Sequence, residues 1–269
     1  IRSCLVGSEM CIRDSRKVAG DKVSMVTCYD YWSAQLLNQS DVDTLLVGDS
    51  LAMVMHGFPS TVHATVDMMA THVAAVRRGA PNKFIVGDMP FMQARYSHDV
   101  ALQGVSELMR AGSNAIKIEG AAGQLDLMAH VVESGVPVMG HLGLTPQSVE
   151  AFGGHKVQGR AEAAAEKILA DAKALEQAGC FALVLECIPQ MLGRKITQAL
   201  SIPTIGIGAG PFTDGQVLVL QDLLGMQADF KPKFLRHYMN GHQALSEAVN
   251  HFHSDVTSGA FPNCQEVYQ

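Results

Sequence analysis

The chain has 269 residues, 48% of them hydrophobic and 17% charged, and its 26 acidic and 20 basic side chains give a formal net charge of −6. Its longest basic run is Arg77-Arg78, so the sequence lacks the basic patch by which proteins bind nucleic acids or anionic membranes. No stretch approaches ~18 uninterrupted apolar residues, which excludes a spanning helix, and the length suffices for one enzyme-sized core.

The first segment of the chain, residues 1–15, has neither helical nor strand periodicity. It resembles the spurious translations that occur at the ends of assembled environmental sequences. We therefore predict a non-native tail over 1–15 and a single catalytic domain over 16–269. Deletion of the tail is expected to leave thermal stability and activity unchanged.

Eight short apolar runs follow, rich in β-branched residues and each bounded by a polar residue or glycine. They lie about 27 residues apart on average, close to the ~30 residues of one βαβ unit. The predicted strands are 23–27, 44–48, 83–87, 115–118, 136–140, 182–186, 203–208 and 217–220.

Helical patterns separate these strands. The clearest is 161–178, which is rich in strong helix formers, has one apolar face and ends before Gly179. Shorter patterns over 72–79 and 107–112 also end on glycine. Alternating strands and helices indicate a parallel sheet, and eight repeats favour a single closed (β/α)8 TIM barrel over an open doubly wound sheet.

Polar side chains end or follow six of the predicted strands. In a parallel barrel these positions converge on one face, where such enzymes build their active sites. Lys117 and Glu119 are two residues apart, so both point to the same side of their strand. The residues at strand ends are Asp30, Asp49, Ser50, Asp88, Lys117, Glu119, His141 and Glu186.

Three of these acids, Asp49, Asp88 and Glu119, would repel one another when brought together unless a proton or a cation neutralised them. Oxygen ligands suit a hard cation such as Mg²⁺, which also retains waters and takes a substrate oxygen. The alternative is that each acid only caps the helix that follows it. Three acids and a lysine at consecutive strand ends favour the metal site. A structural zinc is not favoured, because the sequence has no Cys/His cluster.

Two loops and one histidine pair have open interpretations. The glycine-rich loop 206–210 either presents backbone N–H groups to an anion or forms only a tight turn. The long polar segment 145–160 is either an active-site lid or an ordinary connection. His251 and His253 are interpreted as part of a solvated helix end rather than as metal ligands.

The six cysteines form no CxxC pair and are too few for a disulfide scaffold. They are predicted to be free thiols in a reducing compartment. Because no secretory signal is recognisable either, we expect a cytoplasmic protein.

Several long blocks of the chain carry a family signature. They include LLVGDSLAMVMHG, VGDMPFM, MRAGSNAIKIEG, GHLGLTPQSVEAFGGHKVQGR, LVLECIP and IPTIGIGAG. From about Lys17 to the C-terminus the sequence resembles the ketopantoate hydroxymethyltransferase family. The resemblance implies a barrel of the phosphoenolpyruvate/pyruvate type that requires Mg²⁺ and forms a large homo-oligomer such as a decamer. It also implies transfer of a one-carbon unit from 5,10-methylenetetrahydrofolate to the 2-oxo acid 3-methyl-2-oxobutanoate, on the route to pantothenate.

The resemblance also implies which residues bind metal and substrate. The GDS motif puts a metal ligand at Asp49 and a substrate contact at Ser50, and GDMP puts a metal ligand at Asp88. KIE puts a substrate-binding lysine at Lys117 and a metal ligand at Glu119. Because the substrate would bind to the metal ion, Asp49 and Asp88 are implied to belong to the substrate site as well.

For the chemical step, the LEC motif implies a proton-transfer catalyst at Glu186. Glu186 would remove the C3 proton of the keto acid, whose carboxylate Lys117 and Ser50 would hold. Alternation along the strand turns Glu186 toward the barrel axis and Leu185 outward. His141 either relays a proton or contacts the substrate, or it is a buried structural histidine.

Two rival functions remain at this point. A related Mg²⁺ barrel that cleaves a C–C bond should carry a catalytic cysteine loop, and the GHLGLTPQS stretch holds no cysteine. A barrel that serves only as a scaffold should have lost some of the six implied site residues, and all six are present.

Overall fold

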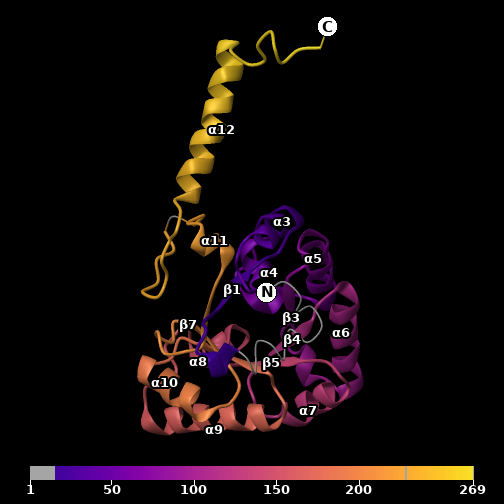
Figure 1. The fold of residues 1–269 in the computed structure, drawn as a ribbon, viewed down its shortest axis with the longest axis vertical. Helices are drawn as coiled ribbons and strands as arrows, with labels where there is room; N and C mark the ends of the chain where they lie inside the picture. Colours follow the sequence, from indigo (N-terminus) through magenta and orange to yellow (C-terminus); the bar gives the residue numbers. More distant parts are fainter. Residues whose placement is uncertain (1–15, 228, 269) are drawn as a thin grey trace. The chain divides into compact units, whose positions relative to one another are not determined.

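A computed structural model of the chain describes residues 16–227 and 229–268 and contains a closed barrel of eight parallel strands (Figure 1). Each strand pairs with the next along the chain, and the eighth pairs with the first. The predicted TIM barrel is therefore confirmed, and the open sheet is not formed. The predicted tail, 1–15, lies outside the described residues.

The strands lie close to their predicted positions. They are β1 (Val23–Thr27), β2 (Thr44–Val47), β3 (Phe84–Asp88), β4 (Ala115–Glu119), β5 (Val138–Gly143), β6 (Ala182–Glu186), β7 (Thr204–Ile207) and β8 (Gly215–Leu218). The fifth strand, predicted at 136–140, ends three residues later than predicted, and the last one, predicted at 217–220, lies two residues earlier. The last strand begins earlier because Gly215 has no side chain, and a Cβ there would overlap the carbonyl oxygen of Val23 on the neighbouring strand.

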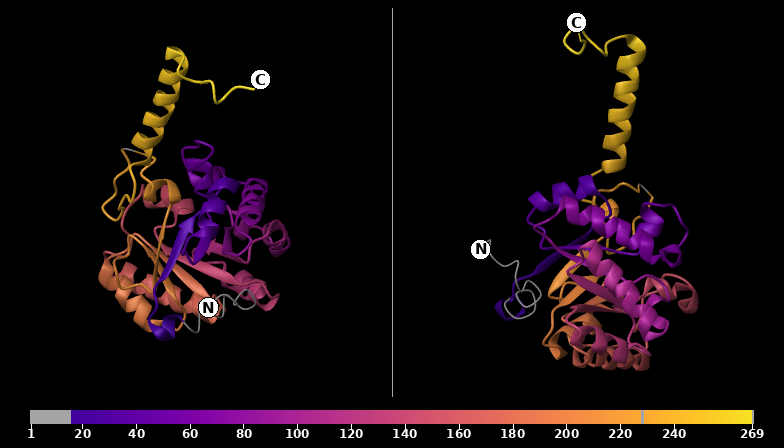
Figure 2. Two further views of the ribbon diagram at one scale, coloured as in Figure 1. Left: turned by 45° about the horizontal axis from the view of Figure 1, so that its top comes forward. Right: turned by 90° about the vertical axis from the view of Figure 1, so that its right-hand side faces the viewer.

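Helices connect the strands and cover the outside of the barrel (Figures 1 and 2). The predicted helix over 161–178 is α9, and no helix forms in residues 208–214, between β7 and β8. The helices within residues 16–218 are α2 (Lys17–Ala19), α3 (Tyr31–Gln39), α4 (Leu51–Val54), α5 (Val66–Gly79), α6 (His98–Ala111), α7 (Leu125–Glu133), α8 (Val149–Phe152), α9 (Glu162–Gln177) and α10 (Gln190–Ala199), with short 3-10 turns at η2 (Thr61–His63), η3 (Gln93–Arg95) and η4 (Pro146–Ser148).

Alternation along the strands divides the core into two layers. On β6, Ala182 and Val184 belong to the cluster inside the barrel. Leu183 and Leu185 belong to the cluster between the strands and the helices. A residue two positions after Val184 therefore faces inward. This confirms the predicted orientations of Glu186 and Leu185.

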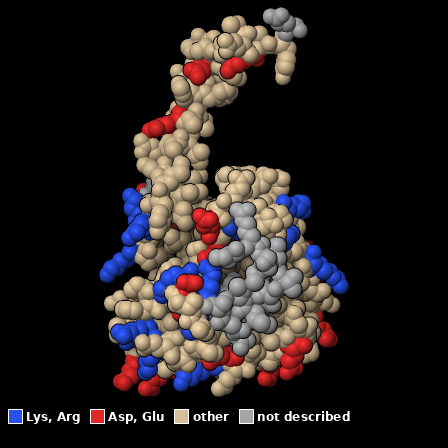
Figure 3. All heavy atoms as spheres, viewed as in Figure 1, with Lys and Arg blue, Asp and Glu red and all other residues tan. Residues whose placement is uncertain are grey.

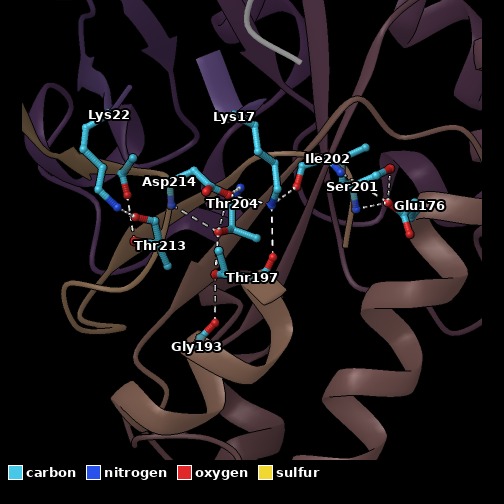
Figure 4. Close-up of polar contacts among 11 residues, drawn as sticks. Lys17, Lys22, Glu176, Gly193, Thr197, Ser201, Ile202, Thr204, Thr213 and Asp214 are labelled. Atoms are coloured by element: carbon cyan, nitrogen blue, oxygen red, sulfur yellow. Dashed lines mark hydrogen bonds and ion pairs between the residues drawn. The ribbon is translucent and has the colours of Figure 1, made fainter. Parts of the chain in front are cut away.

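The amino-terminal end of the barrel is closed by a polar network around Lys17 (Figure 4). Its Nζ donates to the carbonyl oxygens of Thr197 and Ile202 at 3.0 and 2.9 Å and pairs with Oδ2 of Asp214 at 2.9 Å. The same Oδ2 accepts a hydrogen bond from the backbone N–H of Thr204 at 2.9 Å. One lysine thus joins α2 to α10, β7 and the turn before β8 at this end.

Residues Val219–Gln269 form a second compact unit. Its helices are α11 (Leu220–Leu223) and α12 (Gly241–Ser258). His251 and His253 lie on α12, and both are exposed. The same helix exposes four apolar side chains at helical spacing, Leu245, Val249, Phe252 and Val256.

Charged side chains of both signs occur on the face of the barrel unit shown in Figure 3. Within 16–227 and 229–268, none of the helices combines the length and the apolar character needed to cross a membrane.

Candidate active site

The structure gathers the predicted site residues at the carboxyl end of the barrel. Asp88, Glu119 and Glu186 are the last residues of β3, β4 and β6. Lys117 and His141 lie on β4 and β5, and the pair Asp49-Ser50 follows β2. All these positions, except Glu186 and Ser50, are buried.

Three carboxylates converge as predicted. Oxygen atoms of Asp49, Asp88 and Glu119 all lie within 4.8 Å of one another. The backbone N–H of Asp49 also donates to Oδ2 of Asp88 at 3.2 Å, which ties the loop after β2 to the end of β3. Among the described residues this is the only group of three or more such ligands that could hold a metal ion.

The pKa values of these acids reflect their crowding. Burial raises the pKa of Asp49 well above its usual range, and repulsion from Asp88 and Glu119 adds to the effect. Burial also raises the pKa of Asp88, although Lys117 opposes this. Burial likewise acts to raise the pKa of Glu119, but the neighbouring His141 and Lys117 lower it more, and the net shift is downward. The cluster is therefore short of positive charge.

Asp30 shows what a strand-end acid does when it only caps a helix. Its carboxylate accepts hydrogen bonds from the backbone N–H and the hydroxyl of Ser33, both at 2.9 Å, at the start of α3. Asp49 and Asp88 form no such cap. The capping alternative thus describes Asp30 and not the three clustered acids.

Lys117 supplies one positive charge to the cluster. Its Nζ lies 2.8 Å from Oδ1 of Asp88 and 3.8 Å from Oε1 of Glu119. Burial lowers the pKa of Lys117, but the three carboxylates raise it more, so the ammonium stays charged. This one lysine does not balance the three acids if all of them are ionised.

His141 links the cluster to Glu186. Its Nδ1 lies 3.3 Å from Nζ of Lys117 and 3.4 Å from Oε1 of Glu119, and its Nε2 lies 3.3 Å from Oε2 of Glu186. Burial and Lys117 lower the pKa of His141, whereas Glu119 and Glu186 raise it more, to about 9. The imidazole is therefore a buried cation held between two carboxylates.

Glu186 differs from the clustered acids in its accessibility. Its side chain is 18% exposed, compared with 1% for Asp88 and 4% for Glu119. A molecule that entered the site could touch this carboxylate.

The backbone turns sharply after Glu186. Cys187 adopts a left-handed conformation with φ 46°, which is rare for a residue with a side chain. Its N–H donates to the carbonyl of Ile207 at 2.8 Å, and its carbonyl accepts from the N–H of Gln158 at 2.9 Å. Such strain is typical of functional sites. Burial and the charge of Glu186 raise the pKa of the Cys187 thiol to about 11, so it is not poised as a nucleophile.

Two site residues escaped the sequence analysis. Gln147 donates its side-chain amide to Oδ2 of Asp49 at 2.9 Å and its backbone N–H to Oε2 of Glu119 at 3.1 Å. The hydroxyl groups of Tyr29 and Ser50 lie 2.8 Å apart. The only available signal was that Gln147 belongs to the 145–160 segment interpreted as a lid.

The start of the 145–160 segment lines two hollows. One borders the cluster and includes Glu119, Gln147 and Arg95 in its lining. The other, of about 240 Å³, includes Pro146 and Glu150 and the turn after α4. The segment therefore borders the space in which small molecules could bind.

Comparison with known sequences gives a consistent family. A sequence model described as ketopantoate hydroxymethyltransferase matches residues 11–264. A relative named 3-methyl-2-oxobutanoate hydroxymethyltransferase, from Coxiella burnetii (strain CbuG_Q212), is 57% identical over 245 residues, or 91% of this chain and 92% of the relative. A relative of the same name from Francisella tularensis subsp. tularensis (strain WY96-3418) is 52% identical over 252 residues, or 94% of this chain and 95% of the relative.

Among solved structures, the crystal structure of 2,3-dimethylmalate lyase, a PEP mutase/isocitrate lyase superfamily member, is similar to this chain. The TM-score is 0.57 at 15% sequence identity, and the match covers 94% of this chain and 88% of that chain. At this identity the likeness concerns the fold, and it agrees with the predicted barrel of the phosphoenolpyruvate/pyruvate type.

Proposed function

Since the chain belongs to the ketopantoate hydroxymethyltransferase family, we propose that it transfers a hydroxymethyl group to 3-methyl-2-oxobutanoate. The observation that carries the proposal is the convergence of Asp49, Asp88 and Glu119 beside Lys117 and Glu186 in one barrel mouth. The proposed one-carbon donor is 5,10-methylenetetrahydrofolate, and the proposed metal is Mg²⁺.

The residues present fit a divalent hard cation. Oδ1 of Asp88 and Oε1 of Glu119 are buried and accept no hydrogen bond of good geometry, although both lie near Lys117. Oxygen donors of this kind are the ligands that Mg²⁺ prefers. The three carboxylates outnumber Lys117 and the imidazolium of His141 beside them, so a bound cation would offset the remaining negative charge. Asp49, Asp88 and Glu119 would hold it.

When bound, the cation would supply positive charge beside the ketone and carboxylate oxygens of the keto acid. Lys117 and the hydroxyl of Ser50 would orient the substrate carboxylate. Tyr29 supports this role of Ser50, because its hydroxyl lies 2.8 Å from Oγ and limits the positions that Oγ can take.

Glu186 would act as the base that takes the proton from C3 of the keto acid. The resulting carbanion would form a C–C bond to the methylene carbon of the folate as one C–N bond of that carbon breaks. Water would then replace the second C–N bond, which supplies the hydroxyl oxygen and releases tetrahydrofolate. The imidazolium of His141, 3.3 Å from Glu186, would orient this carboxylate. His141 would thus act through Glu186, and its buried position leaves it little direct access to substrate.

The folate is proposed to use the second hollow, of about 240 Å³, whose lining combines residues of the 145–160 segment and of the turn after α4. Its wall contains Pro146 and Glu150, so the 145–160 segment would cover the bound donor. The glycine-rich loop 206–210 has no role in this proposal.

We also propose a large cytoplasmic homo-oligomer. The exposed apolar stripe of α12 supports self-association, because a monomer would leave these side chains in water.

The described cysteines, Cys28, Cys180, Cys187 and Cys264, are free thiols, as expected in a reducing compartment.

The decisive experiment measures tetrahydrofolate release from 5,10-methylenetetrahydrofolate with and without 3-methyl-2-oxobutanoate and Mg²⁺. Release that requires all three components supports the proposal. Release without the keto acid, or no release under any condition by a folded protein, would contradict it.

A further inference from the structure

A pair of histidines outside the carboxylate cluster joins the turn after α4 to α5. His56 follows α4 and is exposed, and His72 lies on α5 and is half-buried. Their Nε2 atoms are 2.9 Å apart, and their rings are nearly perpendicular, at 87°. This contact is a hydrogen bond in which one ring donates and the other accepts.

The second nitrogen of His72 sets the direction of this hydrogen bond. Nδ1 of His72 lies within hydrogen-bond distance of the carbonyl oxygen of Tyr29, which can only accept. The proton of the neutral imidazole is therefore on Nδ1, and Nε2 accepts the hydrogen bond from His56. The histidine pair thus connects the turn after α4 to the backbone of Tyr29, just after β1.

Tyr29 also contacts the opposite end of α4. Its ring is fully buried, and its hydroxyl lies 2.8 Å from Oγ of Ser50, the residue before this helix. At the far end, the N–H of His56 donates to the carbonyl of Leu51 at 3.2 Å. The contacts therefore close a ring, which runs from Ser50 along α4 to the histidine pair and returns to Ser50 through Tyr29.

We propose that His56 and His72 are positioning residues for Ser50, an inference that rests on the proposed function, in which Ser50 holds the substrate carboxylate. A helix of four residues, such as α4, is not stable on its own and needs contacts from outside. Tyr29 supplies such a contact at the start of the helix, and the histidine pair supplies one at its end. Loss of the pair should therefore weaken keto-acid binding and change proton transfer at Glu186 little.

The test compares His56→Leu, which cannot form the hydrogen bond, with His56→Gln, whose amide can still donate to Nε2 of His72. In His56→Leu, the KM for 3-methyl-2-oxobutanoate should rise about 3–10-fold, while kcat stays within about 2-fold of the parent, because Ser50 contributes to binding. His56→Gln should keep the parent KM. His63→Gln is the matched control, because the ring of His63 faces Oγ and the carbonyl oxygen of Ser60.

A double variant tests whether the contacts act as one ring. Tyr29→Phe removes the hydroxyl at the other end of α4, so its combination with His56→Leu should raise KM by less than the product of the two single effects. An unchanged KM in His56→Leu, the same KM in His56→Leu and His56→Gln, or single effects that multiply would each overturn the proposal.

Hydrogen–deuterium exchange of the ligand-free protein separates this inference from the proposed function. The backbone amides of residues 51–57 should exchange faster in His56→Leu than in the parent, and at the parent rate in His56→Gln and His63→Gln. Exchange at the parent rate in His56→Leu would show that the pair does not hold α4. If the parent binds the keto acid without turning it over, only the proposed function fails, and calorimetric affinities replace the KM values. His56 is exposed, so its variants should fold, and melting temperatures check this.

Discussion

The side-chain amide of Gln147 donates a hydrogen bond of 2.9 Å to Oδ2 of Asp49, which lies on another loop of the barrel. The backbone N–H of the same residue reaches Glu119, so a single residue touches two of the three clustered acids. The 145–160 segment is therefore joined directly to the charged centre of the site.

Replacement of this amide should weaken Mg²⁺ binding. Burial, Asp88 and Glu119 raise the pKa of Asp49, and the hydrogen bond from Gln147 opposes them. In Gln147→Ala the pKa should rise further, so more of Asp49 is protonated, and the loss of Mg²⁺ affinity should be larger at pH 6 than at pH 8. Mg²⁺ titrations at both pH values measure this. Gln158→Ala, in the same segment but bonded only to the carbonyl of Lys156 through its side chain, is the control.

Asp88→Asn keeps the shape of a proposed ligand and removes its charge. We expect Mg²⁺ affinity to fall by at least ~10-fold, whereas the stability of the metal-free protein should change little, because Lys117 keeps Glu119 as a partner and repulsion among the acids decreases. Asp30→Asn is matched in chemistry and also follows a strand, but asparagine caps a helix as well as aspartate does. Equal Mg²⁺ affinity in Asp88→Asn and Asp30→Asn would remove Asp88 from the ligand set.

Asp30 and Asp49 also show what the sequence could and could not predict. Alternation along a strand identifies both the strand and its inward side, so the direction of Glu186 and the meeting of the acids could be predicted. Whether an acid after a strand caps a helix depends on its local partners, and Asp30 had Ser33 available. The contacts of Gln147 join loops distant in sequence and leave no periodic signal. Nor does a barrel pattern indicate where the second unit begins.

The network around Lys17 should contribute measurably to stability (Figure 4). Lys17→Met removes three hydrogen bonds from a charged donor with only 15% of its side chain exposed. We expect a loss of about 2 kcal/mol, or about 4–8 °C in melting temperature for a chain of this size. Lys167→Met breaks an ion pair with Asp171 on the solvent side, where 64% of the lysine side chain is exposed, and should change the melting temperature little.

Glu176 should make stability sensitive to acid. Burial raises the pKa of Glu176, but hydrogen bonds from Ser201 and Ile202 lower it more, so it is below the usual value in the folded protein. Its contribution is therefore present above the unfolded pKa and is lost as the pH falls through the folded pKa. The difference in melting temperature between the parent and Glu176→Gln should be constant above about pH 5 and should disappear as the pH falls through the lowered pKa of Glu176. A difference that does not depend on pH would show that the charge of Glu176 does not matter.

Glu186→Gln isolates the proposed proton transfer. Glutamine keeps the size and hydrogen-bonding ability of the side chain at the end of β6 but cannot accept the C3 proton. Exchange of solvent deuterium into C3 of 3-methyl-2-oxobutanoate, with Mg²⁺ present and no folate, should slow by ~10²–10⁴. Mg²⁺ and the keto acid should still bind, because Glu186 lies outside the carboxylate cluster. Exchange at the parent rate would assign the base to another residue, whereas slow exchange with intact binding would identify Glu186 as the base.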